Sequence, residues 1–357
     1  METSEFSECQ VSLGVSACTQ ADGSIVVTNI LDEGPGSLRA AIESANSTAG
    51  GNLIRFSIPG PGPHTIFVGQ TSNAALPDLT DPGTIIDGTT QSGLGGNGPR
   101  IILDGQIPVW QVPINALFIR ADFCEVYGLQ IINFPDDAID LLSASYCRSG
   151  APGRGNVIYN NGLEQDFFPG APNSGPWNGC GIVVRSDALR NEIKGNASGT
   201  DFSGSIIAGN EYCGILIRTA SNNNVVGGSG AGEGNLIAGN EQGIRVQGTS
   251  RANSFVQNEL FCNSVAGIQL EGSGANDGLA APTITTSVVD TIRGTATIQE
   301  GTVEVFVSDT TGCATAPCQG KTYLGTATID AGEWELTVPY AGGVLLNGLE
   351  DLTALTT

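Results

Sequence analysis

Short runs of β-branched residues, each bounded by Gly or Asn, recur between about residues 155 and 270 and constrain the fold strongly. In one of these runs an Ile follows a Gly at positions 182, 215, 244 and 268. Two further runs, typified by residues 205–210 (SIIAGN) and 191–193 (NEI), alternate with it. Three short strands per repeat are typical of one turn of a parallel β-helix. Gly and Asn supply the left-handed backbone at the corners, and stacked turns bury the inward Ile and Val side chains.

The N-terminal part of the chain contains the one segment with a clear helical pattern. Ser37 is a suitable N-cap for a helix whose apolar residues follow at helical spacing from Leu38 to Ala45. The open end of a β-helix exposes apolar core and unpaired strand edges. We therefore expect this helix to cover the first turn of a β-helix that occupies residues 24–275.

Several motifs in this region carry a family resemblance. They are residues 27–29 (VTN), 34–42 (GPGSLRAAI), 45–46 (AN) and 84–91 (TIIDGTTQ), together with the repeated phrases of the NLIAGN type. They look like the secreted bacterial right-handed parallel β-helix proteins, over about residues 24–272. The resemblance implies a right-handed β-helix and a cell-surface context. Because members of that family differ in role, it implies no particular chemistry.

The sequence pattern changes after residue 274, where apolar and polar residues begin to alternate over longer segments. Such alternation is typical of antiparallel strands with one buried face. Residues 303–306 (VEVF), 324–328 (LGTAT) and 334–338 (WELTV) resemble the small bacterial immunoglobulin-like sandwich that often follows such β-helices. We therefore predict an all-β chain, in which a right-handed parallel β-helix with an N-terminal capping helix precedes an immunoglobulin-like β-sandwich at residues 282–357.

The same resemblance implies a last sandwich strand, similar to NTSEFS, that does not follow residue 357. A matching phrase (TSEFS) stands instead in the N-terminal extension, residues 1–23. A sandwich without its edge strand invites strand addition. We therefore predict that residues 2–8 of one copy complete the next copy's sandwich and build a head-to-tail extracellular filament. The predicted donor residues are Thr3, Ser4, Glu5, Phe6 and Ser7, and the predicted acceptor residues are Phe306, Trp334, Leu352 and Ala354.

The N-terminal phrase is also compatible with two alternatives. Residues 8–23 could stretch along the β-helix, since an extended residue spans about 3.4 Å, so that the chain completes its own sandwich. Alternatively, residues 1–9 belong to a preceding domain of a longer repeat protein, and copies again join end to end through the same strand.

Charge and cysteine content bear on location and partners. The chain has 36 acidic and 14 basic side chains, a net charge of −22, which disfavours nucleic acid and anionic membranes as partners. No apolar run reaches the length of a membrane span. Nine cysteines without a CxxC motif favour disulfides and an extracellular or cell-surface location.

Two kinds of covalent modification are predicted. Cys9 with Cys18 and Cys313 with Cys318 flank short loops, whereas Cys180 and Cys213 hold the same place in adjacent turns, as a disulfide or as two stacked thiols. Asn46 and Asn196 stand in triplets of the glycan-acceptor type.

A cell-surface module that binds or cleaves polysaccharides is the alternative to the filament. Asp136, Asp137 and Asp140 faintly resemble the paired aspartates of pectin-hydrolysing β-helices, in which two carboxylates act as acid and base. The Gly-His-Gly and Arg-x-Lys motifs of those enzymes are absent, and we predict that His64, the single histidine, lies in a loop. We therefore assign no catalytic residue.

Further features favour a structural role. Arg185, Arg218 and Arg245 recur in successive turns, but no Asp ladder is expected to face them, so we predict a solvated row. No motif requires a metal or a cofactor, although acidic loops could hold Ca²⁺. A glycan groove should show stacked aromatic side chains, and only 6% of the residues are aromatic. Copies of the chain are the predicted partners, with glycans as a further option.

Overall fold

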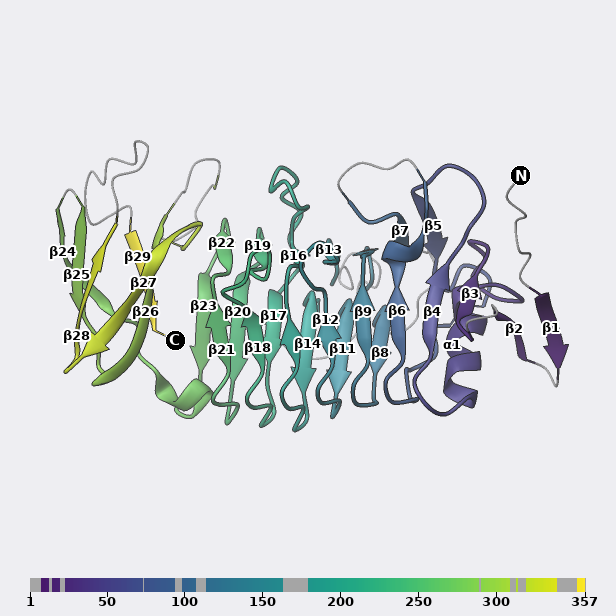
Figure 1. Cartoon of the computed structure of the whole chain (residues 1–357), viewed down its shortest axis with the longest axis horizontal. Coiled ribbons are helices and arrows are strands. Elements are labelled where there is room, and N and C mark those ends of the chain that lie inside the picture. The colour runs from purple at the N-terminus through teal and green to yellow at the C-terminus, as the bar shows by residue number, and fades with distance from the viewer. Residues whose placement is uncertain are drawn as a thin grey trace, which may run out of the picture.

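A computed structural model gives the architecture (Figure 1). The structure describes residues 8–12, 15–19, 23–72, 74–93, 98–106, 114–162, 179–288, 290–308, 313, 319–338 and 352–356. The molecule is elongated, with one helix near the N-terminal end, a row of stacked short strands in the middle and an antiparallel sheet at the C-terminal end.

Three sheets form the sides of the stacked region, and they are named here by their order along each turn. Sheet A contains β1 (Glu8–Ser12), β2 (Val15–Thr19), β3 (Ile25–Val27), β4 (Leu53–Phe56), β6 (Ile85–Asp87), β9 (Glu125–Tyr127), β12 (Arg148–Ser149), β15 (Glu192–Ile193), β18 (Val225–Gly227) and β21 (Ser254–Val256). Sheet B contains β5 (His64–Phe67), β7 (Ile101–Asp104), β10 (Leu129–Ile132), β13 (Val157–Tyr159), β16 (Ala197–Ser198), β19 (Leu236–Ala238) and β22 (Glu259–Phe261). Sheet C contains β8 (Leu117–Ile119), β11 (Ile139–Leu142), β14 (Ile182–Arg185), β17 (Cys213–Ile217), β20 (Gln242–Gln247) and β23 (Ala266–Glu271).

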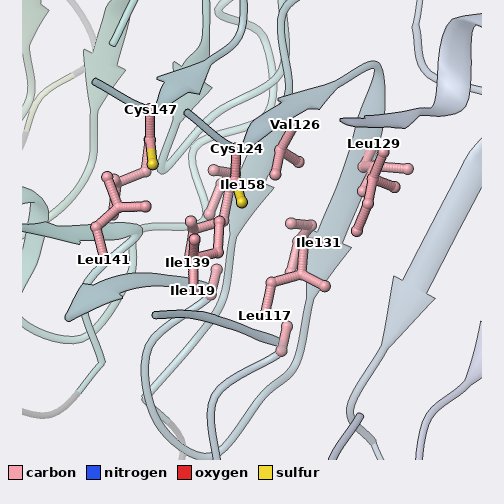
Figure 2. Close-up of a cluster of buried hydrophobic side chains, with 14 of the residues drawn as sticks. Leu117, Ile119, Cys124, Val126, Leu129, Ile131, Ile139, Leu141, Cys147 and Ile158 are labelled. Carbon is pink, nitrogen blue, oxygen red and sulfur yellow. The ribbon is translucent and has the colours of Figure 1, made fainter. Parts of the chain in front are cut away.

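The chain visits the sheets in the order A, B, C and then returns to A, as β9–β10–β11 and β12–β13–β14 illustrate. From β3 onward, neighbouring strands within each sheet pair in parallel. The predicted parallel β-helix is therefore confirmed. Ile182, Ile215 and Ile244 pair in register on sheet C, and all three lie in the continuous apolar core. Figure 2 shows part of this core, with side chains from all three sheets.

Asparagine ladders hold the three corners together. In each ladder the backbone N–H of one Asn donates to the carboxamide oxygen of the Asn one turn further on. The side-chain amide donates to the same oxygen at every step except the last one of the C-to-A ladder, where the amide of Asn253 donates to the carbonyl of Ser221. The A-to-B ladder contains Asn156, Asn196, Asn235 and Asn258; the B-to-C ladder contains Asn161, Asn210, Asn240 and Asn263; the C-to-A ladder contains Asn191, Asn224, Asn253 and Asn276. These buried amides explain why Asn punctuates the repeats.

The N-terminal end is covered as predicted. Helix α1 (Leu38–Ser47) begins at Ser37, whose hydroxyl accepts a hydrogen bond from the N–H of Ala40 at 3.2 Å. The apolar residues of α1 pack into the core of the β-helix. The strands β1 and β2 form an antiparallel hairpin that extends sheet A beyond β3, so this segment is not stretched along the β-helix.

The C-terminal sheet contains β24 (Thr283–Val288), β25 (Thr291–Thr295), β28 (Glu333–Thr337), β27 (Thr322–Asp330), β26 (Glu300–Val307) and β29 (Leu352–Thr356), in this antiparallel order. Its own apolar cluster contains Ile292, Val303, Val305 and Trp334. Short 3₁₀ helices lie at η1 (Gly88–Thr90) and at η2 (Ala275–Gly278), where the β-helix ends. The sequence alternation therefore correctly predicted an antiparallel region with one buried face.

The C-terminal region also closes the open end of the β-helix. The side chain of Gln319 accepts from the amide of Asn263 at 2.8 Å and so adds a last member to the B-to-C ladder. The N–H of Leu260 donates to the carbonyl of Gly320 at 2.8 Å. A disulfide joins Cys262 to Cys313, with the Cα atoms 5.0 Å apart. Both ends of the apolar core are therefore covered by chain from outside the repeats.

Candidate functional site

The outer face of sheet C, together with the corner that leads from it to sheet A, gathers charged and aromatic side chains. Strands β8, β11 and β14 place Phe118, Asp140 and Val183 in register on this face. Inward residues alternate with them, so the pleat of each strand decides which side chains reach the surface.

Asp140 and Arg185 form a bidentate ion pair on this face. The guanidinium donates to both carboxylate oxygens, with its shortest contact at 2.7 Å, and Asn115 donates to the same carboxylate at 3.1 Å. Asp140 is 1% exposed. Burial raises the pKa of Asp140, although the hydrogen bonds and positive charge of Arg185 oppose the rise.

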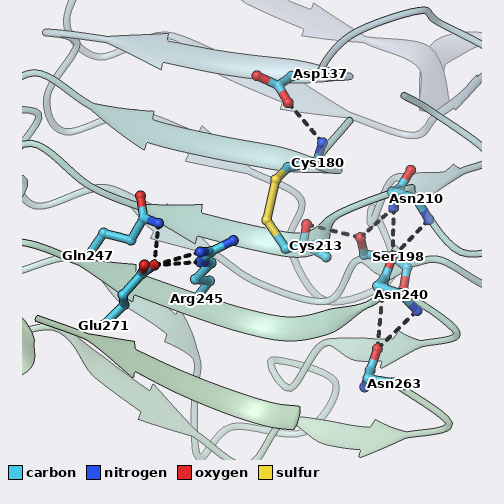
Figure 3. The surroundings of a disulfide bond; sticks show 11 residues. Asp137, Cys180, Ser198, Asn210, Cys213, Asn240, Arg245, Gln247, Asn263 and Glu271 are labelled. Carbon is cyan, nitrogen blue, oxygen red and sulfur yellow. Dashed lines mark hydrogen bonds and ion pairs between the residues drawn. A yellow bond between two sulfur atoms is a disulfide. The ribbon is translucent and has the colours of Figure 1, made fainter. Parts of the chain in front are cut away.

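Asp137 stands two residues before the start of β11, the strand that carries Asp140. Its carboxylate accepts a hydrogen bond from the N–H of Cys180 at 2.8 Å (Figure 3). Burial and the negative charges of Asp136 and Asp140 hold the pKa of Asp137 well above its ordinary value. The two buried carboxyls thus differ in environment, which is the usual basis of an acid and base pair. However, Asp137 is only 4% exposed, so neither carboxyl is open to a bulky substrate in this structure.

The middle of the face is apolar. Cys180 and Cys213 form a disulfide across adjacent turns, with the Cα atoms 4.6 Å apart (Figure 3). The prediction of a bond or thiol stack at this place is confirmed in the form of the bond. Val183 and Leu216 pack beside it in a small cluster separate from the core.

The prediction that the three arginines form a solvated row is wrong, because they are paired or partly buried. Arg185 is tied to buried Asp140, and Arg245 donates to the carboxylate of Glu271 at 2.6 Å, with only 12% of its side chain exposed. Burial and the nearby charge of Arg185 lower the pKa of Arg218. The sequence did not show that Asp140 stands one turn before Arg185 and pairs with it.

The corner between sheets C and A carries a stacked pair of exposed aromatic rings. Phe123 and Tyr146 occupy the same corner position in adjacent turns, with ring centroids 5.1 Å apart and planes 15° apart. They are 55% and 44% exposed. Arg190 follows in the next turn and donates to the hydroxyl of Tyr146 at 3.1 Å. We call Phe123, Tyr146 and Arg190 the aromatic corner.

The backbone at the aromatic corner is left-handed. The φ angles of Phe123, Tyr146 and Arg190 are 63°, 59° and 57°. Asn223 takes the next turn of this corner with a φ of 58°, and Asn is far better suited to the conformation. A left-handed conformation costs about 1–2 kcal/mol for an ordinary residue, and such residues cluster at functional sites. Bulky aromatic rings are unusual in this conformation, which the later turns of the corner fill with Asn223 and Ala252.

Two further arginines gather around Phe118, on the face of sheet C that leads to the aromatic corner. Arg120 directly follows β8, three residues before Phe123, and its guanidinium lies 4.5 Å from the centre of the Phe118 ring. Arg185 lies 5.5 Å from the same ring. Arg120 also pairs with Asp78 at 2.7 Å, while 47% of its side chain stays exposed. The surface therefore combines flat apolar rings with guanidinium groups.

Sequence reasoning missed the aromatic corner because the three residues are spaced unevenly along the chain. The strand register supplies the missing signal, since Glu125 pairs with Arg148 and Arg148 pairs with Glu192. Each aromatic-corner residue stands two positions before one of these paired residues. An alignment of the repeats on their sheet A strands would have brought the three together.

Several predicted site residues have different surroundings from those expected. His64 begins strand β5 and is 8% exposed, so the predicted loop position is wrong. Asn196 is 2% exposed, and its amide donates to the carbonyl of Ser149 and to Asn235, which leaves no place for a glycan on the folded chain. The side chain of Asn46 also bonds to the backbone of its neighbours, and glycosylation there stays a prediction.

The predicted cysteine pairs fare differently. Cys313 bonds to Cys262 instead of Cys318, which lies outside the described residues; the flanking loop suggested a partner close in sequence, but the bond links two regions. Cys9 and Cys18 stand opposite each other in the β1–β2 ladder. Cys124 and Cys147 are free, buried thiols.

The predicted polymerisation residues are only partly described. Thr3, Ser4, Glu5, Phe6 and Ser7 lie outside the described residues. Phe306 and Trp334 are buried, at 0% and 3% exposed. Leu352 and Ala354 belong to β29, which pairs with β26. Strand donation stays a prediction.

Metal sites and membrane spans have no candidate in the described part of the chain. Among those residues, no group of three or more His, Cys, Asp or Glu side chains is arranged to hold a metal ion. Within the same ranges, no helix has the length and apolar character that crossing a membrane requires.

Comparisons with known proteins give limited matches. No protein-family model and no curated protein matches the chain. Among solved structures, it is similar to an alginate lyase from Paenibacillus sp. str. FPU-7, with 18% identity and a TM-score of 0.26 over 70% of this chain and 96% of that one. It is also similar to the A-module of the mannuronan C-5 epimerase AlgE6 of Azotobacter vinelandii, with 14% identity and a TM-score of 0.29 over 68% of this chain and 77% of that one. The fold itself follows from the parallel pairing of strands in sheets A, B and C.

Proposed function

We propose that the protein is an extracellular β-helix module that binds a polysaccharide at the aromatic corner. The observation that carries the proposal is the exposed stack of Phe123 on Tyr146, held in a left-handed backbone that disfavours such residues. The two disulfides among the described residues support an oxidising, extracellular location.

The chemistry of the corner fits a sugar chain. The apolar face of a sugar ring packs against an aromatic ring. Phe123 and Tyr146 stack on each other, and Arg190 lies 5.8 Å from the centre of the Tyr146 ring, so the surface left for a sugar is the outer face of Phe123 and the exposed ring edges. Arg190, which donates to the Tyr146 hydroxyl, adds donors beside the stacked rings for sugar hydroxyl or carboxylate oxygens. Arg120, three residues before Phe123, adds a half-exposed guanidinium over Phe118. The stacked rings lie 5.1 Å apart on adjacent turns, so a linear chain running along the axis would meet the exposed edges of both.

Binding has more support than cleavage. An acid and base pair must reach the bond that breaks, whereas Asp137 and Asp140 are covered and serve to hold Arg185 and the N–H of Cys180. We therefore propose a binding module and keep a cleaving module as an outcome of the test.

The test uses the matched variant Phe123→Asn/Tyr146→Asn. Asn tolerates the left-handed backbone and already stands at the same corner as Asn223, so the fold should be kept. In affinity electrophoresis through neutral and acidic polysaccharides, the wild type should be retarded by at least one polymer. The variant should bind about tenfold more weakly, since losing the stacking interactions of two rings costs about 1.4 kcal/mol or more.

The control is Phe67→Asn, because Phe67 is an exposed aromatic residue at the end of β5 on sheet B, away from the corner. Equal loss in the control, or no retardation of the wild type by any polymer, would contradict the proposal. Release of reducing or unsaturated ends that Asp137→Asn abolishes would instead favour a cleaving enzyme.

A filament formed by strand addition is the second candidate, and the edge of the C-terminal sheet favours it. Strand β29 pairs with β26 on one side, and no other strand of the described residues pairs with its second edge. Residues 2–8 of another copy are the proposed added strand, with Phe6 as the anchor. Electron microscopy should show end-to-end fibres of the whole chain and monomers after deletion of residues 1–8. Fibres that persist after the deletion would exclude this donor.

A further inference from the structure

A concave surface lies at a different corner, between sheets A and B. It is a groove of about 530 Å³ whose lining includes Arg100, Arg154 and Phe202. Its floor is formed by Gly88, Gly128, Gly155, Gly195 and Gly234 from five successive turns. We call this surface the glycine groove. At about 4.8 Å per turn, the floor runs roughly 19 Å along the axis, which suits an extended chain better than a compact ligand.

The floor has no side chains because the turns pack too closely for any. A Cβ atom on Gly155 would lie 1.7 Å from the carbonyl oxygen of Gly195, and one on Gly88 would lie 2.3 Å from that of Gly128. The backbone is therefore bare along the groove, and the chemistry comes from its walls.

Two arginines in the walls have unused hydrogen-bond donors. Arg154 lies flat on the ring of Tyr127, 3.8 Å from its centre, and one Nη pairs with Asp87 at 2.7 Å. Arg100 donates from one Nη to the carbonyl of Gln91 at 3.1 Å, and its Nε is buried without a hydrogen-bond partner among the described residues. A guanidinium has five N–H donors in a fork that matches a carboxylate. Within the described residues, the Nη donors that make neither of these two bonds are left for a ligand, whereas the buried Nε of Arg100 is not.

An exposed aromatic ring completes the wall. Phe202 is 40% exposed and stands on a tight turn between β16 and β17. The carboxylate of Asp201 fixes that turn, because it accepts hydrogen bonds from the N–H groups of Ser205 and Ile206 and from the hydroxyl of Ser203. The ring is therefore held rigidly at the groove, which lowers the entropy lost on binding.

We propose that the glycine groove binds an extended polysaccharide strand through its carboxylates, with Arg100 and Arg154 as the carboxylate ligands and Phe202 as the stacking ring. This site is separate from the aromatic corner, which lies between sheets C and A, and it does not depend on the function proposed there. The net charge of the chain is −22, so a groove lined by two arginines differs from the acidic character of the molecule.

The experiment compares a carboxylated polymer with its neutral form. Polygalacturonate, alginate and hyaluronate are tested by affinity electrophoresis and calorimetry, together with fully methyl-esterified polygalacturonate, which keeps the backbone and loses the charge. We expect at least one acidic polymer to bind, and Arg100→Gln/Arg154→Gln to weaken that binding at least tenfold. Phe202→Ala should weaken it severalfold without touching either arginine.

Two control variants separate binding at the groove from other effects. Arg293→Gln removes an exposed arginine of the C-terminal sheet and should change nothing. Phe123→Asn/Tyr146→Asn should keep the binding that the groove provides. A loss of binding at the aromatic corner can therefore be distinguished from a loss of binding at the glycine groove. The proposal is overturned if no acidic polymer binds, if the esterified polymer binds as tightly as the acidic one, or if the arginine variant binds like the wild type while its unfolding transition is unchanged.

Discussion

The β-helix and the C-terminal sheet are both built from short strands with apolar cores, yet they use their polar side chains in opposite ways. In the β-helix, buried Asn side chains bond to the backbone and side chains of the next turn. In the C-terminal sheet, a typical polar pair such as Arg293 and Glu335 is half-exposed on both sides. The buried Asn contacts hold successive turns in register, whereas the ion pair lies on the surface and is largely exposed to solvent.

This difference explains how an irregular repeat can form a regular stack. The steps between repeats vary because loops at the corners vary, but each ladder Asn still meets its counterpart one turn away. An antiparallel sheet fixes its register through turns and alternating burial instead. We therefore expect the β-helix to be much more sensitive than the C-terminal sheet to the loss of a polar side chain.

The largest contrast should come from Asn196→Ala and Arg293→Gln. Asn196 accepts from Asn156 and donates to Asn235 while it is 2% exposed, so its removal leaves several buried polar groups without partners. The free energy of unfolding should fall by about 3–5 kcal/mol. Arg293→Gln should change it by about 0.5 kcal/mol or less.

Urea unfolding followed by circular dichroism measures both values. Equal effects of the two variants would remove the basis of the comparison. A small effect of Asn196→Ala would mean that water replaces the amide in the ladder.

Much of the fold could be predicted because its determinants are local. Gly and Asn at corners, the cap at Ser37 and the alternation after residue 274 are each visible within a few residues. The ladders were not predicted, although their Asn residues were part of the repeated phrases. For this reason Asn196 was assigned to glycosylation, when its place in the phrase marks it as a ladder residue.

The candidate sites were harder to predict because they depend on residues far apart in sequence. Phe123 and Tyr146 meet only once the turns are aligned, and a long connection separates Tyr146 from Arg190. The glycine groove depends on Arg100 and Arg154, which come from different turns and leave no motif. Cys313 likewise finds Cys262 rather than a cysteine nearby. These contacts depend on how the turns of the chain align in register, and the composition and spacing of the sequence do not define that alignment well.

The second prediction concerns the bond that joins the two regions. Cys262 and Cys313 are 51 residues apart in sequence, so Cys262→Ser/Cys313→Ser frees a long loop in the unfolded chain. The C-terminal sheet should lose about 2–4 kcal/mol of stability, with little change in the β-helix. Differential scanning calorimetry should then resolve an earlier transition. A single cooperative transition at an unchanged temperature would show that the bond does not couple the regions.

The third prediction sharpens the comparison at the boundary. Gln319 comes from the C-terminal region but completes an Asn ladder of the β-helix by accepting from Asn263. Gln319→Ala should cost about 1–3 kcal/mol, because it leaves buried groups of Asn263 without a partner. Hydrogen exchange should rise first in β22, at the end of the stack. Gln299→Ala, at an exposed position between β25 and β26, is the matched control and should have little effect.

The smallest effects should appear in the pH dependence, where the two ends of the molecule should respond with opposite sign. At the N-terminal end, burial tends to raise the pKa of Asp32, but hydrogen bonds from the backbone of Ser72, Gly69 and Thr71 outweigh it and lower the pKa from 3.8 to about 2. At the C-terminal end, burial raises the pKa of Glu304, although the N–H of Gln257 opposes the rise.

The sign of each contribution follows from linkage. Asp32 binds its proton less readily in the folded state, so the stability it contributes is present above about pH 4 and is lost as the pH falls towards about 2. Glu304 binds its proton more readily in the folded state, so stability is lost as the pH rises above its ordinary value of 4.5. Asp32→Asn should therefore flatten the acid limb of the unfolding free energy. Glu304→Gln should raise the unfolding free energy at neutral pH, since the amide oxygen can still accept from Gln257. If both variants shift the profile in the same direction, the two carboxyls do not sit in the opposed environments that their contacts describe.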